Sequence, residues 1–100
     1  MNHFQIEERS LALHRAIARR IRENPALLDI AKMNFEKWIS DQGETPYWSE
    51  WKKILNSSPE EIIDFLVSHD QKAVWLRQSS PFCGILTPKE RWKIYESFTT

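Results

Sequence analysis

The placement of the prolines is the sequence feature that most constrains the fold. All five prolines directly follow an asparagine, serine or threonine, and four of these pairs precede a helical pattern: Asn24-Pro25, Thr45-Pro46, Ser58-Pro59 and Thr87-Pro88. Proline suits the first position of an α-helix, and the side-chain oxygen before it can accept a free backbone N–H of the first turn. A glutamate three residues after Ser58 and after Thr87 completes a capping box at both places. The sequence therefore predicts short helices that begin within about two or three residues of these prolines.

Apolar residues recur every three or four positions between the proline pairs, which is the spacing of a buried helix face. The first helix is predicted from about Phe4 to Glu23, and the second begins at Leu28 and ends at a left-handed cap on Gly43. Further helices are predicted around 48–55, after Pro59, after the capping-box pattern of 68–71 and after Pro88. A chain of 100 residues is too short for two cores. We therefore expect one domain, residues 1–100, folded as a compact all-α bundle of five or six short helices.

The segment 79–86 has no helical pattern and is apolar for a loop. Two interpretations are open. The loop can present Phe82 to a partner as an apolar anchor, at a low entropic cost because its proline restricts the backbone. Alternatively, the loop folds back to close the core, with Phe82 and Leu86 buried. Both interpretations hold if Phe82 is buried while Arg77 and Gln78 face a partner.

Five tryptophans among 100 residues indicate a core built partly on indole rings. Three of them fall on the apolar stripes and are expected in the core: Trp38, Trp75 and Trp92. Tyr47, Trp48 and Trp51 crowd two turns of one helix, and three large rings at such close positions cannot all point inward. Tyr47 is therefore expected to be partly exposed, either as an anchor at a protein interface or at a half-covered corner of the core.

The formal net charge of the chain is +0, which argues against general binding to polyanions. The charges are nevertheless unevenly distributed along the chain. Residues 1–23 contain five arginines and three glutamates, and residues 24–70 contain four lysines and nine acidic residues. Five cations face two glutamates in 71–100. The polar N-terminus lacks the apolar stretch of a secretory signal, and no window is apolar enough to span a membrane. We therefore expect a cytoplasmic protein with no membrane partner, which the lone cysteine, Cys83, also fits.

The densest cluster of charge lies on the first predicted helix, where Arg15, Arg19 and Arg22 share the face opposite the apolar stripe. Arginine contacts phosphates and carboxylates with two hydrogen bonds at once, so this face could bind either nucleic acid or an acidic protein. Alternatively, it is the solvated face of an amphipathic helix, whose basic last turn suits the helix dipole. No second basic patch joins it, so nucleic acid is a possible but not a favoured partner.

No set of residues in the sequence indicates catalysis, a metal or a cofactor. None of the three histidines has another histidine or a cysteine at ligand spacing, and there is no P-loop, HExxH, GxSxG or dinucleotide fingerprint. Glu60, Glu61 and Asp64 lie in the first turns of a predicted helix, where negative charge is favourable without any catalytic role. We therefore expect a protein that is not an enzyme and that carries neither cofactor nor metal.

The C-terminal third contains the most specific pattern, LRQSSPF at 76–82, followed by Gly84, Leu86 and Pro88 and then by ERW at 90–92 and Tyr95. A looser pattern covers the rest of the chain, with Leu13-His14, Ala16, Arg20, residues 24–28, Asn34, Trp38, Trp51 and Leu55. Together they resemble a group of small all-helical bacterial proteins, often encoded beside nucleotidyltransferase-type toxins, that look like antitoxins. The resemblance implies a protein-binding inhibitor that masks a cognate toxin.

Two other functions are compatible with the sequence, namely a nucleic-acid-associated regulator that uses the arginine face, and a small adaptor or anti-defence protein. The specific pattern, the non-helical segment and the basic end of the chain overlap in 77–92, where we expect the partner contact. An apolar anchor contributes more than an ion pair at a rim, so Phe82→Ala should weaken binding more than Arg91→Ala. The candidate partner-binding residues are Arg77, Gln78, Ser80, Phe82, Arg91, Tyr47, Arg15, Arg19 and Arg22.

Overall fold

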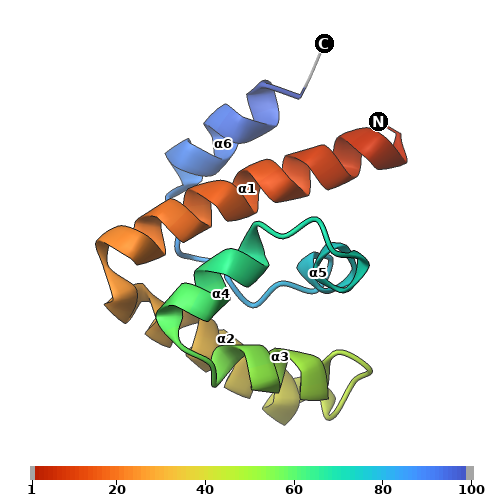
Figure 1. Ribbon diagram of the computed structural model, residues 1–100, viewed down its shortest axis with the longest axis vertical. Helices are drawn as coiled ribbons and strands as arrows, with labels where there is room; N and C mark the ends of the chain where they lie inside the picture. Colours follow the sequence, from red (N-terminus) through yellow and green to blue (C-terminus); the bar gives the residue numbers. More distant parts are fainter. Residues whose placement is uncertain (1, 99–100) are drawn as a thin grey trace.

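A computed structural model describes residues 2–98 of the chain. This part of the chain contains six α-helices and a single 3₁₀ turn, and it has no β-strand (Figure 1). The elements are α1 (His3–Glu23), η1 (Pro25–Leu27), α2 (Leu28–Gln42), α3 (Trp48–Leu55), α4 (Pro59–Leu66), α5 (Gln71–Arg77) and α6 (Pro88–Glu96). The predicted all-α, single-domain architecture is confirmed, and no helix in 2–98 has both the length and the apolar character needed to cross a bilayer.

The local start signals work as predicted at Ser58-Pro59 and Thr87-Pro88, whereas the helix after Pro46 begins at Trp48 with Tyr47 at its N-cap and no side-chain cap. The hydroxyl of Ser58 accepts the Glu61 N–H at 3.2 Å, and the Glu61 carboxylate accepts the Ser58 N–H at 3.4 Å. Thr87 and Glu90 form the same reciprocal pair at 3.1 and 2.9 Å. Both capping boxes are therefore confirmed.

The predicted capping box over 68–71 is wrong. The hydroxyl of Ser68 accepts the N–H of Asp70 at 3.1 Å, which closes a local turn, and α5 begins only at Gln71 with Asp70 at the N-cap. Ser68 therefore lies two residues too early to cap the helix.

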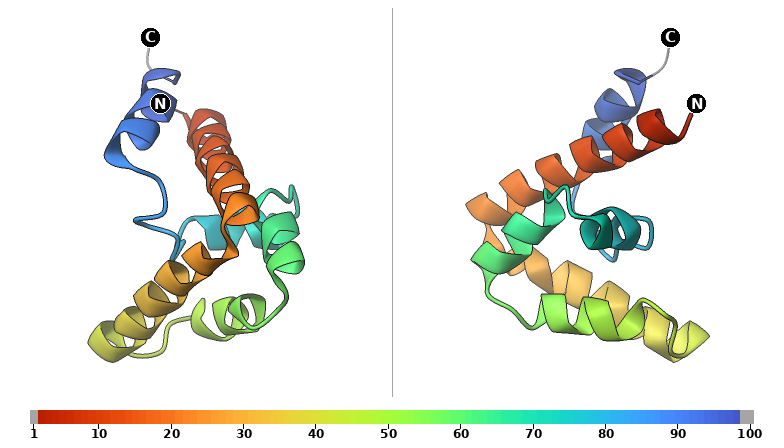
Figure 2. Two further views of the ribbon diagram at one scale, coloured as in Figure 1. Left: turned by 90° about the vertical axis from the view of Figure 1, so that its left-hand side faces the viewer. Right: turned by 45° about the vertical axis from the view of Figure 1, so that its right-hand side comes forward.

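The helices are arranged around α1, which crosses the molecule and packs against α4, α5 and α6 (Figure 1). α4 also contacts α3 and α5, and α2 contacts α3. α2 and α3 lie at the opposite end of the molecule from α6 (Figures 1 and 2). As a result α6 packs mainly on α1, and none of its residues is buried.

The core is centred on Trp51, which is 1% exposed. Its ring meets Phe65 and Phe82 edge to face, with centroid separations of 5.9 and 5.8 Å. Phe82 belongs to the segment between α5 and α6, so this segment supplies core side chains although it contains no helix. Of the two open interpretations, the structure therefore supports the one in which the segment folds back to close the core.

Polar contacts hold the segment 79–86 in this position. The amide of Asn34 on α2 donates to the carbonyl oxygens of Pro81 and Cys83, both at 2.8 Å. The indole N–H of Trp51 donates to the hydroxyl of Ser79 at 3.2 Å. Gly84 has a φ of 93°, a conformation that favours glycine, and it allows the chain to turn back toward α6.

Two of the three tryptophans expected in the core are exposed, so this expectation was wrong for them. Trp92 is 63% exposed because α6 is covered mainly on its α1 side. Trp75 is 39% exposed, and one side of it is covered by Tyr47, with ring centroids 4.9 Å apart. Trp38 is half-buried.

Candidate functional site

A cavity, called the main cavity below, lies between α1, α5, the segment that follows α5, and α6. Its volume is about 520 Å³, within the range of small-molecule sites in proteins. Residues between positions 3 and 17 of α1 line one wall, residues between 74 and 86 line a second, and Arg91 and Tyr95 of α6 line a third. The cavity is therefore built from parts of the chain that are distant in sequence.

The cavity brings together five of the nine residues that the sequence singled out: Arg77, Gln78, Ser80, Phe82 and Arg91. Only Gln78 and Arg91 among them are exposed. Phe82 is 1% exposed, which fits the interpretation that buries it in the core and not the one that presents it to a partner. Its ring fills the space between His14 and Trp51, where no partner can reach its full surface.

Arg77 was predicted to face a partner on the surface, but its side chain is only 6% exposed. Its Nη1 atom donates to the carbonyl oxygens of Leu66 at 3.3 Å and Ser68 at 2.7 Å. Burial lowers the pKa of Arg77, the charge of Glu7 opposes that shift, and the charge of Arg15 adds to it. The guanidinium nevertheless stays protonated at neutral pH, because arginine titrates far above it. Arg77 is therefore a buried cation in the cavity wall.

His14 and Ser80 form a hydrogen bond across the cavity wall. His14 Nδ1 lies 2.7 Å from the carbonyl oxygen of Ser10, which can only accept, so Nδ1 carries the proton. His14 Nε2 then accepts the hydroxyl proton of Ser80 at 2.8 Å. Burial is the main cause that lowers the pKa of His14 to about 4, so the ring is neutral at pH 7. Ser80, predicted to contact a partner, is half-buried and bonded to α1 instead.

The His14–Ser80 pair has the spacing of a nucleophile and its general base, but its chemistry favours a structural role. A general base is most effective when its pKa lies near the working pH, and the pKa of His14 is about 4. The Ser80 oxygen also accepts the Phe82 N–H at 3.3 Å. The pair therefore ties the segment 79–86 to α1. His14 lies on the buried stripe of α1, but its partner is 66 positions away, so no sequence pattern could indicate the bond.

Positive charge predominates around the cavity. Arg9, Arg77 and Arg91 line it, with Glu7 as the one carboxylate among the described lining residues. The guanidinium of Arg9 lies 5.1 Å from the ring centroid of Tyr95, a cation–π contact that joins α1 to α6. Arg91 is exposed. The site thus combines one buried cation with cations nearer the surface.

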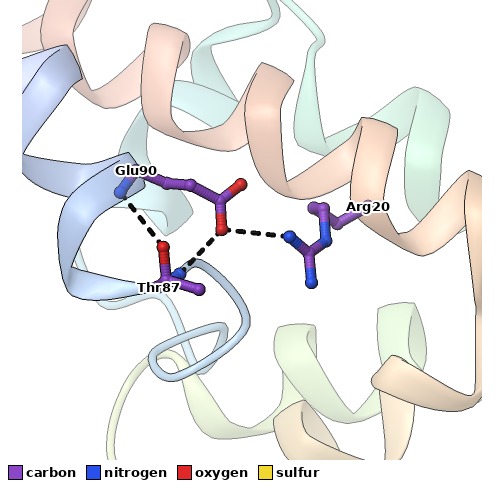
Figure 3. A network of polar contacts seen from close by, with 3 residues as sticks. All are labelled: Arg20, Thr87 and Glu90. Atoms are coloured by element: carbon purple, nitrogen blue, oxygen red, sulfur yellow. Dashed lines mark hydrogen bonds and ion pairs between the residues drawn. The ribbon is translucent and has the colours of Figure 1, made fainter.

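The other four predicted residues lie outside this cavity. Arg15, Arg19 and Arg22 are exposed on α1, as the sequence predicts for that face. They are displaced around the helix from the side that meets α6, where Arg20 binds Glu90 at 3.0 Å (Figure 3). Tyr47 is half-buried and lines a second cavity of about 230 Å³ near α2 and α3. The structure therefore separates the arginine face and Tyr47 from the main cavity.

Residues 2–98 contain no group of three or more histidine, cysteine, aspartate or glutamate side chains placed to hold a metal ion. Cys83 is exposed and is a free thiol. The chain was also compared with protein-family models, with curated proteins and with solved structures. None of the three comparisons found a match.

Proposed function

We propose that this protein is a protein-binding inhibitor of the antitoxin type, which acts in the cytoplasm and uses α6 to bind an acidic surface of its partner. The observation that carries the proposal is the exposure of Trp92, a large apolar ring that is 63% exposed. Tryptophan and arginine are the residue types most enriched among the side chains that dominate binding energy at protein interfaces. Arg91 is the exposed neighbour of Trp92 in sequence.

The charge of α6 indicates the kind of partner. Lys89, Arg91 and Lys93 are all exposed, while Glu90 is held by Arg20 of α1. Charge complementarity steers association and suppresses wrong partners. Lys89 and Lys93, one turn apart, and Arg91 on the cavity side of α6 therefore suit a partner surface rich in carboxylates. The resemblance of the sequence to antitoxin-like proteins supports the same class of function.

A nucleic-acid-associated regulator is the second candidate, because Arg15, Arg19 and Arg22 are exposed together on another face of α1. The affinity of a protein for nucleic acid falls steeply as the salt concentration rises, and the slope of this fall increases with the number of phosphate contacts that its cations make. Protein contacts centred on a tryptophan depend much less on salt. The two candidates therefore use different surfaces and have different salt dependence.

The test is co-expression of the protein with the product of the adjacent gene, followed by affinity measurement on the purified pair. Trp92→Ala and Arg91→Glu are each expected to raise Kd about 10-fold or more, as for residues at the centre of an interface. Arg19→Glu is the matched control on the other face and is expected to change Kd by less than about 3-fold. Greater weakening by Arg19→Glu than by Arg91→Glu, or DNA binding that Arg19→Glu abolishes, would contradict the proposal.

A further inference from the structure

We propose that the cavity between α1, the segment 79–86 and α6 is a binding site for a carboxylate with an apolar body, whose carboxylate pairs with Arg77. This site goes beyond the proposed inhibitor function, because it can be occupied without a protein partner. The proposal depends on a buried cation, an apolar wall and an excess of positive charge at one place.

The buried cation has no ion-pair partner among residues 2–98, and Glu7 acts on its charge without a direct contact. Arg77 is 6% exposed, and no carboxylate lies within ion-pair distance of it in residues 2–98. Both of its hydrogen bonds use Nη1 and go to neutral carbonyl oxygens. Within that part of the chain its Nε and Nη2 atoms have no partner, although the side chain lines the cavity. A buried charge is costly unless it is paired, so a ligand that brings a negative charge to this position is favoured.

The shape and chemistry of arginine favour a carboxylate as that charge. The planar guanidinium presents two parallel N–H donors that match the two oxygens of a carboxylate. Arg91 and Arg9 add positive potential, against the single opposing charge of Glu7 on the described lining. The neutral His14 does not compete, because its two ring nitrogens are occupied by Ser10 and Ser80.

Much of the remaining lining is apolar, so the cavity suits a ligand that has an apolar part as well as a charge. Ile6, Leu13 and Ile17 contribute from α1, and Val74 and Leu86 contribute from the opposite wall. An inorganic anion would leave these side chains in contact with water. An aliphatic chain would cover them and gain from the hydrophobic effect. A cavity of about 520 Å³ has room for such a chain.

Titration calorimetry with octanoate, octan-1-ol and inorganic phosphate tests the proposal on the whole chain without any partner. Octanoate is expected to bind at least about 10-fold more tightly than octan-1-ol, which has the same tail without the charge, and than phosphate, which lacks the tail. Equal binding of octanoate and octan-1-ol would overturn the proposal, as would phosphate binding as tight as that of octanoate.

Variants locate the binding to the cavity. Glu7→Gln removes the opposing charge at an exposed position and should tighten octanoate binding by about 2- to 3-fold, whereas Glu23→Gln at the far end of α1 should not change it. Arg77→Lys keeps the charge but loses the planar fork, and should weaken octanoate binding by about 10-fold. If Arg77→Lys fails to fold, the octanoate affinity of Glu7→Gln is the deciding measurement. An affinity equal to that of the unsubstituted protein then overturns the proposal.

A competition experiment between octanoate and the protein partner shows whether the carboxylate comes from a free organic acid or from that partner. Octanoate that binds without displacing the protein partner assigns the cavity to a free organic acid. Octanoate that displaces the partner assigns it to a carboxylate of that partner. Failure of octanoate to bind refutes this inference alone, since the affinity test with Trp92→Ala and Arg91→Glu stands without it.

Discussion

His14 and Arg77 are two buried basic side chains in one cavity wall, and burial affects their charges differently. Burial lowers the pKa of His14 to about 4, so the imidazole is neutral at pH 7 and bonds to Ser10 and Ser80. Burial also lowers the pKa of Arg77, but a guanidinium titrates so far above neutrality that it keeps its charge. The neutral His14 therefore connects α1 to the segment 79–86 through its hydrogen bonds, whereas Arg77 keeps a positive charge that a ligand can pair with.

The lowered pKa of His14 predicts that stability falls with acidification. An unfolded histidine titrates near 6.5 and the folded one near 4, so protons bind preferentially to the unfolded state. The stability is fully present above about pH 6.5 and declines as the pH falls toward 4, by roughly 3 kcal/mol at most. Urea unfolding between pH 4 and 8 measures this decline.

The control variants isolate the contribution of His14. His14→Gln should flatten the profile between pH 4.5 and 6.5, whatever its effect on stability at pH 8. His69→Gln, at an exposed position, should leave the profile unchanged. Contacts also lower the pKa values of Glu50 and Glu90, so their stabilisation is lost as the pH falls below about 4.5, outside this window. A profile of His14→Gln that parallels the natural protein would refute the assignment.

At the scale of elements, two identical local motifs have different roles. Ser58–Glu61 at the start of α4 is a capping box only. Thr87–Glu90 at the start of α6 is a capping box whose carboxylate also accepts a hydrogen bond from Arg20 of α1 at 3.0 Å (Figure 3). The second box therefore both begins a helix and attaches it to the rest of the molecule.

A pair of glutamine substitutions separates these two roles. Glutamine can still accept the N-cap N–H, so Glu61→Gln and Glu90→Gln should both keep their helix starts. Only Glu90→Gln loses the charge that binds Arg20, so we expect it to lower Tm more than Glu61→Gln and to speed amide hydrogen exchange in α6 selectively. Added salt should reduce the difference. Equal effects of the two variants would show that the Arg20 contact does not hold α6.

At the scale of the whole molecule, the segment 79–86 connects α1 to α2 and α3, which also contact each other. Phe82 packs between His14 of α1 and Trp51 of α3, while Asn34 of α2 bonds to the backbone of the same segment. The segment thus completes a core shared by α1, α2 and α3, although it contributes no helix of its own.

Phe82→Ala is accordingly expected to destabilise the protein strongly. Removing a fully buried phenylalanine ring costs about 3–5 kcal/mol in lost contacts and cavity formation. Phe4→Ala is the matched control, since Phe4 is 69% exposed and its loss should cost less than about 0.5 kcal/mol. Urea unfolding monitored by circular dichroism measures both. Similar stability of the two variants would mean that the segment does not close the core.

The sequence by itself determined where most helices begin. Ser58 and Thr87 cap helices as predicted, and the helix expected after Pro46 begins at Trp48. These features depend on hydrogen bonds and backbone angles within about four residues, so neighbouring sequence is sufficient to specify them. The predicted capping box at Ser68 was wrong because the Ser68 hydroxyl accepts the Asp70 N–H in a local turn instead of a backbone N–H in the first turn of α5.

Only the tertiary structure decided which side chains are buried and what they contact. The indole of Trp51 is 1% exposed and that of Trp92 is 63% exposed, although both lie at regular helical spacing. The difference arises because α3 faces the shared core, whereas α6 packs mainly on α1. The buried charge of Arg77 and the bond between His14 and Ser80 likewise depend on elements that meet only after folding. Periodicity defines an apolar face on each helix, but burial depends on which other elements cover that face.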